Sequence, residues 1–308
     1  KAHPITDVNP RLKGVFTALV TPFNEEGGID WPAFDRLIDR QLEAGIAGLV
    51  PVGTTGEAAT LEPDEAEALI ARTVTRVAGR AYVLAGTGTN NTRKSIEATR
   101  RAEASGADGV LLITPYYNKP TQEGLLAHFG AIADATRCDV MLYSVPGRTG
   151  VAIAPESAAQ LARTHRNIVA IKEAGGDPAR VTALRSACGN GFAVHSGDDG
   201  LALPFYALGA CGLTSVLSNY APEACVAQYR AFMAGDMNAA LGWHERMAEL
   251  VAALFAETSP GPVKRALAMS NQMSDTMRLP LVRIGEATEH RLKMAIAGFS
   301  GAAQPGLI

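Results

Sequence analysis

The sequence has little of several features that mark large classes of protein. Its 308 residues include four cysteines, none of them spaced as CxxC, so neither a disulfide framework nor a cysteine-rich zinc site is expected. No apolar run reaches the roughly 18 residues that a membrane-spanning helix needs. The formal net charge of -3 argues against a nucleic-acid binder, whose binding face is usually basic. These absences favour a globular cytoplasmic protein and leave small anionic substrates open.

What the sequence has is a repeated alternation of short apolar runs and helical patterns. Helix start signals follow many of the runs, with Asp30 and Asn91 in N-cap positions and Pro63 in a first turn. Because the runs are near-continuous, they are typical of parallel strands covered on both faces. Eight units of this kind predict a closed (β/α)8 TIM barrel. The runs occupy residues 15–20, 46–53, 81–86, 109–114, 139–145, 168–172, 192–197 and 212–218.

The same pattern divides the chain into three parts. Residues 1–12 form an N-terminal tail that lacks the apolar core of a signal peptide. Residues 13–233 form the barrel. Helical patterns after residue 222 exceed the one helix needed to close it, so residues 234–308 are predicted to be a C-terminal helical extension packed on the barrel.

Lys172 is the sharpest candidate for chemistry. It is the one lysine among seven that ends an apolar strand, and the C-terminal ends of the strands carry the active site in this fold. Burial there disfavours the charged ammonium, and a free amine can add to a ketone to give an imine. The alternative is an ion pair with Glu173 or Asp198, which the sequence alone leaves open.

Polar residues at other strand ends could serve such chemistry. Tyr143 and Tyr117, with the hydroxyls of Thr54 and Thr55, could move the protons that making and breaking an imine requires. Taken singly, such tyrosines are more often packed aromatic side chains.

Arg148 follows a tight turn at the same rim and suits a carboxylate, although a surface ion pair is an equal alternative. The six histidines show no paired ligand spacing, so no metal is expected. His195 near Asp198 and Asp199 keeps a metal-dependent aldolase from being excluded.

Five motifs in order resemble the dihydrodipicolinate synthase family, within the wider group of pyruvate lyases that includes N-acetylneuraminate lyase. The similarity covers nearly the whole chain, from about Gly14 to about Gly298. The motifs are GTTGE at 53–57, PYYN at 115–118, YSVPGRTG at 143–150, IKEAGG at 171–176 and SGDD at 196–199.

The resemblance implies that Lys172 forms the Schiff base with pyruvate and that no further cofactor is needed. Tyr143 would exchange protons with Thr54 and Tyr117, the latter reaching across from a neighbouring subunit of a homotetramer built as a dimer of dimers. Pyruvate would be bound by Thr55, Gly197 and the main chain near Thr214, where the family usually has Ile or Val.

The resemblance also implies the second substrate. Arg148 in the PGRTG segment would bind the carboxylate of L-aspartate 4-semialdehyde, giving 4-hydroxy-tetrahydrodipicolinate for lysine and diaminopimelate biosynthesis. Inhibition by lysine is expected to be weak or absent, because Ala58, Pro63, Ala66 and Lys94 replace its polar and acidic ligands while Asn90 and Tyr116 remain. Two alternatives stay open: a related aldolase or hydratase-aldolase with another aldehyde acceptor, and a non-catalytic barrel that binds a keto acid.

Overall fold

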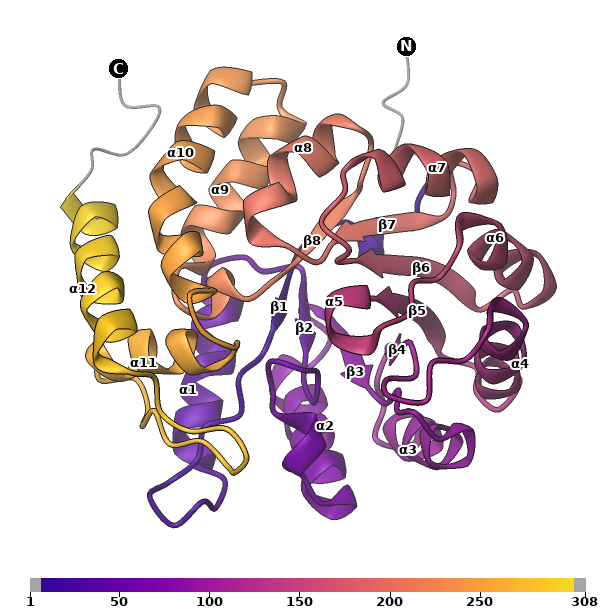
Figure 1. Ribbon diagram of the computed structural model, residues 1–308, viewed down its shortest axis with the longest axis horizontal. Coiled ribbons are helices and arrows are strands. Elements are labelled where there is room, and N and C mark those ends of the chain that lie inside the picture. The colour runs from indigo at the N-terminus through magenta and orange to yellow at the C-terminus, as the bar shows by residue number, and fades with distance from the viewer. Residues whose placement is uncertain (1–6, 302–308) are drawn as a thin grey trace.

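The computed structural model describes residues 7–301, and its centre is a closed barrel of eight parallel strands in chain order (Figure 1). All eight strands expected from the apolar runs are confirmed, each within a few residues of its predicted position. The strands are β1 (Gly14–Ala18), β2 (Gly48–Val50), β3 (Tyr82–Gly86), β4 (Gly109–Ile113), β5 (Asp139–Ser144), β6 (Ile168–Glu173), β7 (Ala193–Ser196) and β8 (Gly212–Ser215).

Helices surround this barrel as a (β/α)8 fold requires. No helix within residues 7–301 combines the length and apolar character that crossing a bilayer demands. The helices are α1 (Trp31–Glu43), α2 (Pro63–Val77), α3 (Thr92–Ala104), α4 (Gln122–Ala133), α5 (Pro146–Thr149), α6 (Pro155–Thr164), α7 (Ala179–Cys188), α8 (Ala202–Ala207), α9 (Pro222–Met233), α10 (Met237–Leu254), α11 (Gly261–Met269) and α12 (Glu286–Gly301).

Local sequence signals explain where several helices begin and end. The side chains of Asp30 and Asn91 accept hydrogen bonds from the backbone amides of Ala33 and Lys94, which caps α1 and α3 as predicted. Gly45 follows α1 with a φ of +81°, a conformation that glycine adopts without strain and that reverses the chain toward β2. A glycine turn thus returns the chain from α1 to β2.

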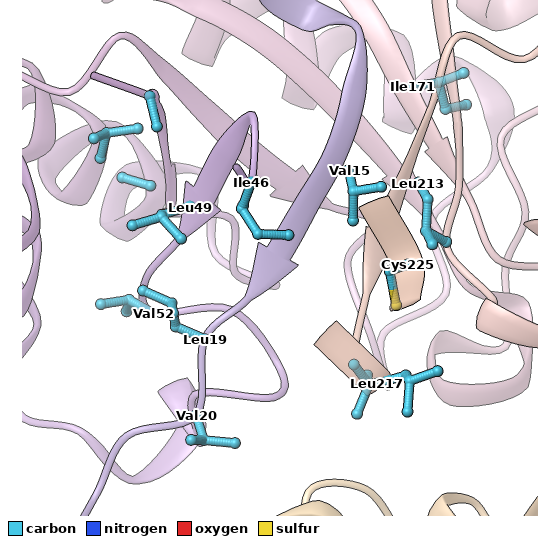
Figure 2. Close-up of a cluster of buried hydrophobic side chains, with 14 of the residues drawn as sticks. Val15, Leu19, Val20, Ile46, Leu49, Val52, Ile171, Leu213, Leu217 and Cys225 are labelled. Carbon is cyan, nitrogen blue, oxygen red and sulfur yellow. The ribbon is translucent and has the colours of Figure 1, made fainter. Parts of the chain in front are cut away.

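Two hydrophobic layers hold the fold together. The larger one lies between the strands and the helices, and Figure 2 shows part of it, with Val15, Leu49 and Leu213 among its labelled side chains. The second fills the barrel interior, where Phe16, Leu84 and Met141 are buried. Because successive residues of a strand face opposite sides, each of the strands β1 to β7 supplies both layers, which is why their sequences are apolar without alternation.

The end of the barrel opposite the C-terminal strand ends is covered by the segment before β1. Val8 and Leu12, both part of the predicted N-terminal tail, are buried with the interior cluster, and a 3-10 turn at Pro10–Leu12 brings them there. Residues 1–6 of that tail lie outside the described residues. Val8 and Leu12 of this segment therefore pack as part of the barrel core.

The helices after β8 form a layer on one side of the barrel. α9 packs beside β1, and α10 contacts α9, α11 and α12 outside it (Figure 1). The predicted helical extension is thus present over residues 234–301, and residues 302–308 of it lie outside the described residues. The segment between α11 and α12 returns toward the barrel, since the Arg278 side chain contacts Glu65 of α2 and the carbonyl of Gly27.

Candidate active site

A cavity of about 350 Å³ opens at the C-terminal ends of the strands. Three of the residues predicted for the site line it: Thr54, Tyr143 and Arg148. The loops after β2, β3, β4 and β5 form most of the wall, and the C-terminal extension contributes Thr258, Ser259, Pro280 and Leu281. The cavity is therefore bounded by both the barrel and the extension.

Lys172 lies inside the barrel next to this cavity. It stands two residues after Ala170, a member of the interior cluster, so both side chains face inward from β6. Lys172 is aligned with Tyr143 on β5 and His195 on β7, and its Nζ lies 4.1 Å from the centre of the Tyr143 ring. The side chain is 5% exposed. The amine is thus withdrawn from bulk water and held against a phenol.

The two carboxylates proposed as partners of Lys172 are directed elsewhere. Glu173 accepts hydrogen bonds from Arg180 at 2.8 Å and from the amide of Gly175 at 2.8 Å. The Asp198 side chain accepts from the amide of Gly200. Within residues 7–301, no carboxylate makes an ion pair or hydrogen bond with Lys172. The ion-pair alternative for Lys172 is therefore wrong.

His195 and Asp199 do not converge on a metal position. Both ring nitrogens of His195 are engaged, by Thr214 Oγ1 at 3.1 Å and by the carbonyl of Leu12 at 2.7 Å. Asp199 accepts hydrogen bonds from Ser215 and from the amides of Val216 and Leu217. Across the described part of the chain, no group of three or more His, Cys, Asp or Glu side chains is arranged to hold a metal ion.

Gly197 and Thr214 lie behind Lys172, outside the lining of the cavity. A Cβ at Gly197 would lie 2.6 Å from Ala174 Cβ and 3.0 Å from Cε of Lys172, so a larger residue would force the lysine stem to shift. Thr214 is buried on β8 with its hydroxyl on His195. Thr55 is also buried, in the turn after β2.

The predicted chain of hydroxyls is not closed within one subunit. No hydrogen bond joins the hydroxyls of Tyr143, Thr54 and Tyr117 in the described residues. Tyr117 is 91% exposed and has a φ of +71°, whereas its neighbour Tyr116 lines the cavity. Tyr117 is therefore displayed on the surface beside its own cavity.

Arg148 is exposed at the cavity wall on the short helix α5. Its Nη2 donates a hydrogen bond to the carbonyl of Ser259 at 3.2 Å, and none of the ion pairs within residues 7–301 includes it. The alternative of a surface ion pair for Arg148 is therefore wrong. A guanidinium anchored to a neutral carbonyl keeps donors for an anionic group.

A second buried lysine, Lys264, pairs with a residue of the cavity wall and was not predicted from the sequence. Glu57 lines the cavity and forms an ion pair with Lys264 of α11 at 2.6 Å, and both side chains are buried. Glu57 also accepts a hydrogen bond from the backbone amide of Arg278. The GTTGE motif pointed to Glu57, but no local signal identified a partner more than 200 residues away.

A (β/α)8 barrel with its polar groups gathered at the C-terminal ends of its strands has the architecture of an enzyme. The model of the dihydrodipicolinate synthetase family matches residues 11–298. The chain belongs to this family.

Individual relatives are similar to this chain over almost their full length. The chain is 48% identical over 287 residues to a 4-hydroxy-tetrahydrodipicolinate synthase of Nitratidesulfovibrio vulgaris strain DP4, covering 93% of this chain and 98% of that one. The solved structure of the corresponding synthase from Methylacidiphilum fumariolicum SolV has a TM-score of 0.92 and 43% identity, covering 94% and 96% of the two chains. A dihydrodipicolinate synthase from Acinetobacter baumannii, solved in complex with pyruvate, has a TM-score of 0.91 and 42% identity, covering 94% and 99%.

Proposed function

We propose that this protein condenses pyruvate with L-aspartate 4-semialdehyde to give 4-hydroxy-tetrahydrodipicolinate, in lysine and diaminopimelate biosynthesis, without a cofactor. The observation that carries the proposal is the environment of Lys172: a buried amine without a carboxylate partner, 4.1 Å from the ring centre of Tyr143 and next to the cavity. The names of the relatives support the choice of reaction.

Covalent catalysis begins when the Lys172 amine attacks the keto carbon of pyruvate and water leaves. The resulting iminium withdraws electrons, so a proton is lost from the methyl group and an enamine forms. Tyr143 is the group that we propose accepts and returns protons, because its ring centre lies 4.1 Å from the Lys172 amine.

The enamine carbon then attacks the aldehyde carbon of the acceptor, and the new alkoxide takes up a proton. The amino group of the acceptor next attacks the imine carbon and displaces the Lys172 amine, which closes the ring and regenerates the enzyme. One water is released overall, and no oxidant or reductant is needed.

Substrate carboxylates need donors at both ends of the cavity. For pyruvate we propose Thr55, with Gly197 and the main chain near Thr214 beside the lysine stem. For the acceptor we propose Arg148, whose guanidinium is held by Ser259 at the cavity wall. This arrangement places the carboxylate of the acceptor away from that of pyruvate.

We also propose that the working unit contains at least two subunits, within a dimer of dimers. The proton chain from Tyr143 through Thr54 needs a further hydroxyl, and Tyr117 displays its own on the surface. A side chain so exposed and held at a positive φ is well placed to enter the cavity of a partner.

The acceptor assignment is tested by assaying purified protein with pyruvate and a panel of aldehydes: L-aspartate 4-semialdehyde, N-acetylmannosamine and sugar aldehydes. Turnover is expected with the semialdehyde. Arg148→Ala should lower kcat/KM for it by about a hundredfold, since a charge-assisted bidentate contact is lost. Borohydride trapping of pyruvate should stay close to that of the wild type. Turnover with a sugar aldehyde alone, or undiminished turnover in Arg148→Ala, would make the acceptor assignment wrong.

A further inference from the structure

His195 is fully buried inside the barrel and has a hydrogen-bond partner on each ring nitrogen. The Leu12 carbonyl only accepts hydrogen bonds, so Nε2 must carry the proton and donate it at 2.7 Å. Nδ1 is then unprotonated and accepts the hydroxyl of Thr214 at 3.1 Å. The two contacts thus fix a single neutral tautomer.

This imidazole adjoins the proposed imine site. His195 is aligned with Lys172 across the β6–β7 pair and with Gly212 across the β7–β8 pair. Its ring packs edge-on against Phe16 at 4.9 Å, and a Cβ at Gly212 would lie 2.5 Å from Nε2. The ring therefore has no room to turn or withdraw while the strands keep their places.

We propose that His195 is a positioning residue for the imine site: from the strand position aligned with Lys172, it fixes the β8 segment at Thr214 to the N-terminal segment at Leu12. The inference rests on the proposed function, because it assumes that pyruvate binds at Lys172 against the main chain near Thr214. The proposal also gives the N-terminal segment an indirect part in the reaction, because the Leu12 carbonyl sets the tautomer of His195.

Hydrogen-bond satisfaction explains why the two side chains form a pair. Thr214 is 1% exposed, so its hydroxyl cannot turn to water, and His195 is the partner within reach. A buried polar group that loses its partner is costly. Loss of the His195 acceptor would therefore let Thr214 seek another partner and shift the strand end that faces pyruvate.

Protonation would disrupt the same arrangement. Burial lowers the pKa of His195 to about 4, and the nearby charge of Lys172 acts in the same direction, against the hydrogen bond to Leu12. The ring is therefore neutral at neutral pH and can accept from Thr214. The groups that face it are Lys172 from β6, Thr214 from β8 and the Leu12 carbonyl, with Phe16 apolar on β1.

Two amide substitutions can separate the two hydrogen bonds. His195→Asn places an amide oxygen near the position of Nδ1, which keeps an acceptor for Thr214 but does not reach Leu12. His195→Gln places its amide near the position of Nε2, which keeps a donor for Leu12 but leaves Thr214 unpaired. The molecule offers a matched control in His128 of α4, also buried and bonded through Nδ1 to a threonine, Thr92, at 2.9 Å. His128→Asn and His128→Gln are the control variants.

The measurements are Tm, the KM for pyruvate with saturating acceptor, and the rate at which borohydride traps the pyruvate adduct. His195→Gln is expected to raise the KM for pyruvate roughly tenfold, the effect of one lost buried hydrogen bond, and His195→Asn to change it less than about threefold. All four variants should lower Tm, and the His128 variants should keep the wild-type KM.

Three results would overturn the inference. One is a His195→Gln protein that loses Tm like the His128 variants but keeps the KM and trapping rate of the wild type. If His195→Gln does not fold, Thr214→Val replaces it, and an unchanged KM for pyruvate in that variant counts equally against the proposal. Finally, a wild-type protein that gives no borohydride adduct removes the proposed function itself, and this inference with it.

Discussion

Two buried lysines near the cavity, Lys172 with a proposed catalytic role and Lys264 in an ion pair, differ in the partners of their amines. Lys172 and Lys264 are 5% and 0% exposed, and each Nζ lies over an aromatic ring, Tyr143 at 4.1 Å and Phe23 at 4.4 Å. Lys264 also has the carboxylate of Glu57 at 2.6 Å, whereas Lys172 has no such partner in the described residues. Burial alone therefore does not distinguish the lysine proposed to form the imine.

The presence or absence of a carboxylate partner determines whether each amine is available as a nucleophile. Burial lowers the pKa of Lys264, and the negative charge of Glu57 opposes this effect without cancelling it. A carboxylate that holds an ammonium or amine keeps it in place and blocks it from attacking a carbonyl carbon. We infer that the ion pair of Lys264 with Glu57 fixes α11 to the turn that carries Thr54 and Thr55. Lys172 keeps its amine free beside the cavity.

Replacement of Lys172 should have the largest effect on activity. Lys172→Met keeps the length and the apolar stem but removes the nucleophile, so turnover should fall roughly a thousandfold or more. Because no ion pair is broken, Tm should stay near the wild-type value. Steady-state kinetics and a thermal melt check both parts, and turnover that survives would assign the chemistry to another group.

Replacement of Lys264 should lower the stability of the fold and leave imine formation on Lys172 intact. Lys264→Met leaves Glu57 buried without its cation, which should cost about 3–5 kcal/mol of unfolding free energy. The folded fraction should still give a pyruvate adduct on Lys172. The control is Lys264→Met combined with Glu57→Gln, in which stability should return because no charge is left unpaired. Denaturant unfolding measures the difference, and equal stability of Lys264→Met and wild type would contradict the account.

Acid should destabilise the fold through its buried histidines. Burial lowers the pKa of His195 and of His128 to about 4 each, below the ordinary value of 6.5. The unfolded chain then binds more protons than the folded one between these values, so stability is constant above pH 6.5 and falls as the pH drops toward 4. Each histidine should contribute roughly 3 kcal/mol to the loss. Unfolding curves between pH 7 and 4 measure it, and His128→Asn should flatten the slope.

A methyl group at Gly197 should slow imine formation modestly. The added Cβ would lie 2.6 Å from Ala174 Cβ and 3.0 Å from Lys172 Cε, so the lysine stem must move. Gly197→Ala should reduce the borohydride trapping rate about tenfold, since overpacking of this kind costs on the order of 1–3 kcal/mol. The control is Gly147→Ala, a position where a Cβ meets nothing within 4 Å. Equal trapping rates in both variants would remove the steric argument.

Free lysine should have the smallest effect on turnover. Lys94 is exposed on α3, where a second cation would repel the ammonium of lysine. Inhibition of turnover is expected to be weak or absent when lysine is titrated at saturating pyruvate. An inhibition constant below a millimolar would contradict this expectation.

The sequence predicted those parts of the molecule that depend on local pattern. Every strand was found from apolar runs, and Lys172 was singled out because it ends one of them. Contacts between distant segments could not be found in this way. The ion pair of Glu57 with Lys264 joins residues 207 positions apart, and the hydrogen bond of His195 to Leu12 joins residues 183 apart. Each needs the closed barrel before its two ends meet.

Some residues that line the cavity could likewise not be predicted from local sequence. Pro280 and Leu281 line it from a segment that carries no motif, because they arrive there through the packing of α11 and α12. Tyr117, in contrast, stood out in the sequence, yet its exposure outside its own cavity becomes visible only in three dimensions.

The most direct test of the central claim is to reduce the protein with borohydride in the presence of pyruvate and to map the adduct by peptide mass spectrometry. We expect one stable adduct per chain, on Lys172, and an unmodified Lys264 in the same sample. An adduct on Lys264, or none on either lysine, would contradict the central claim.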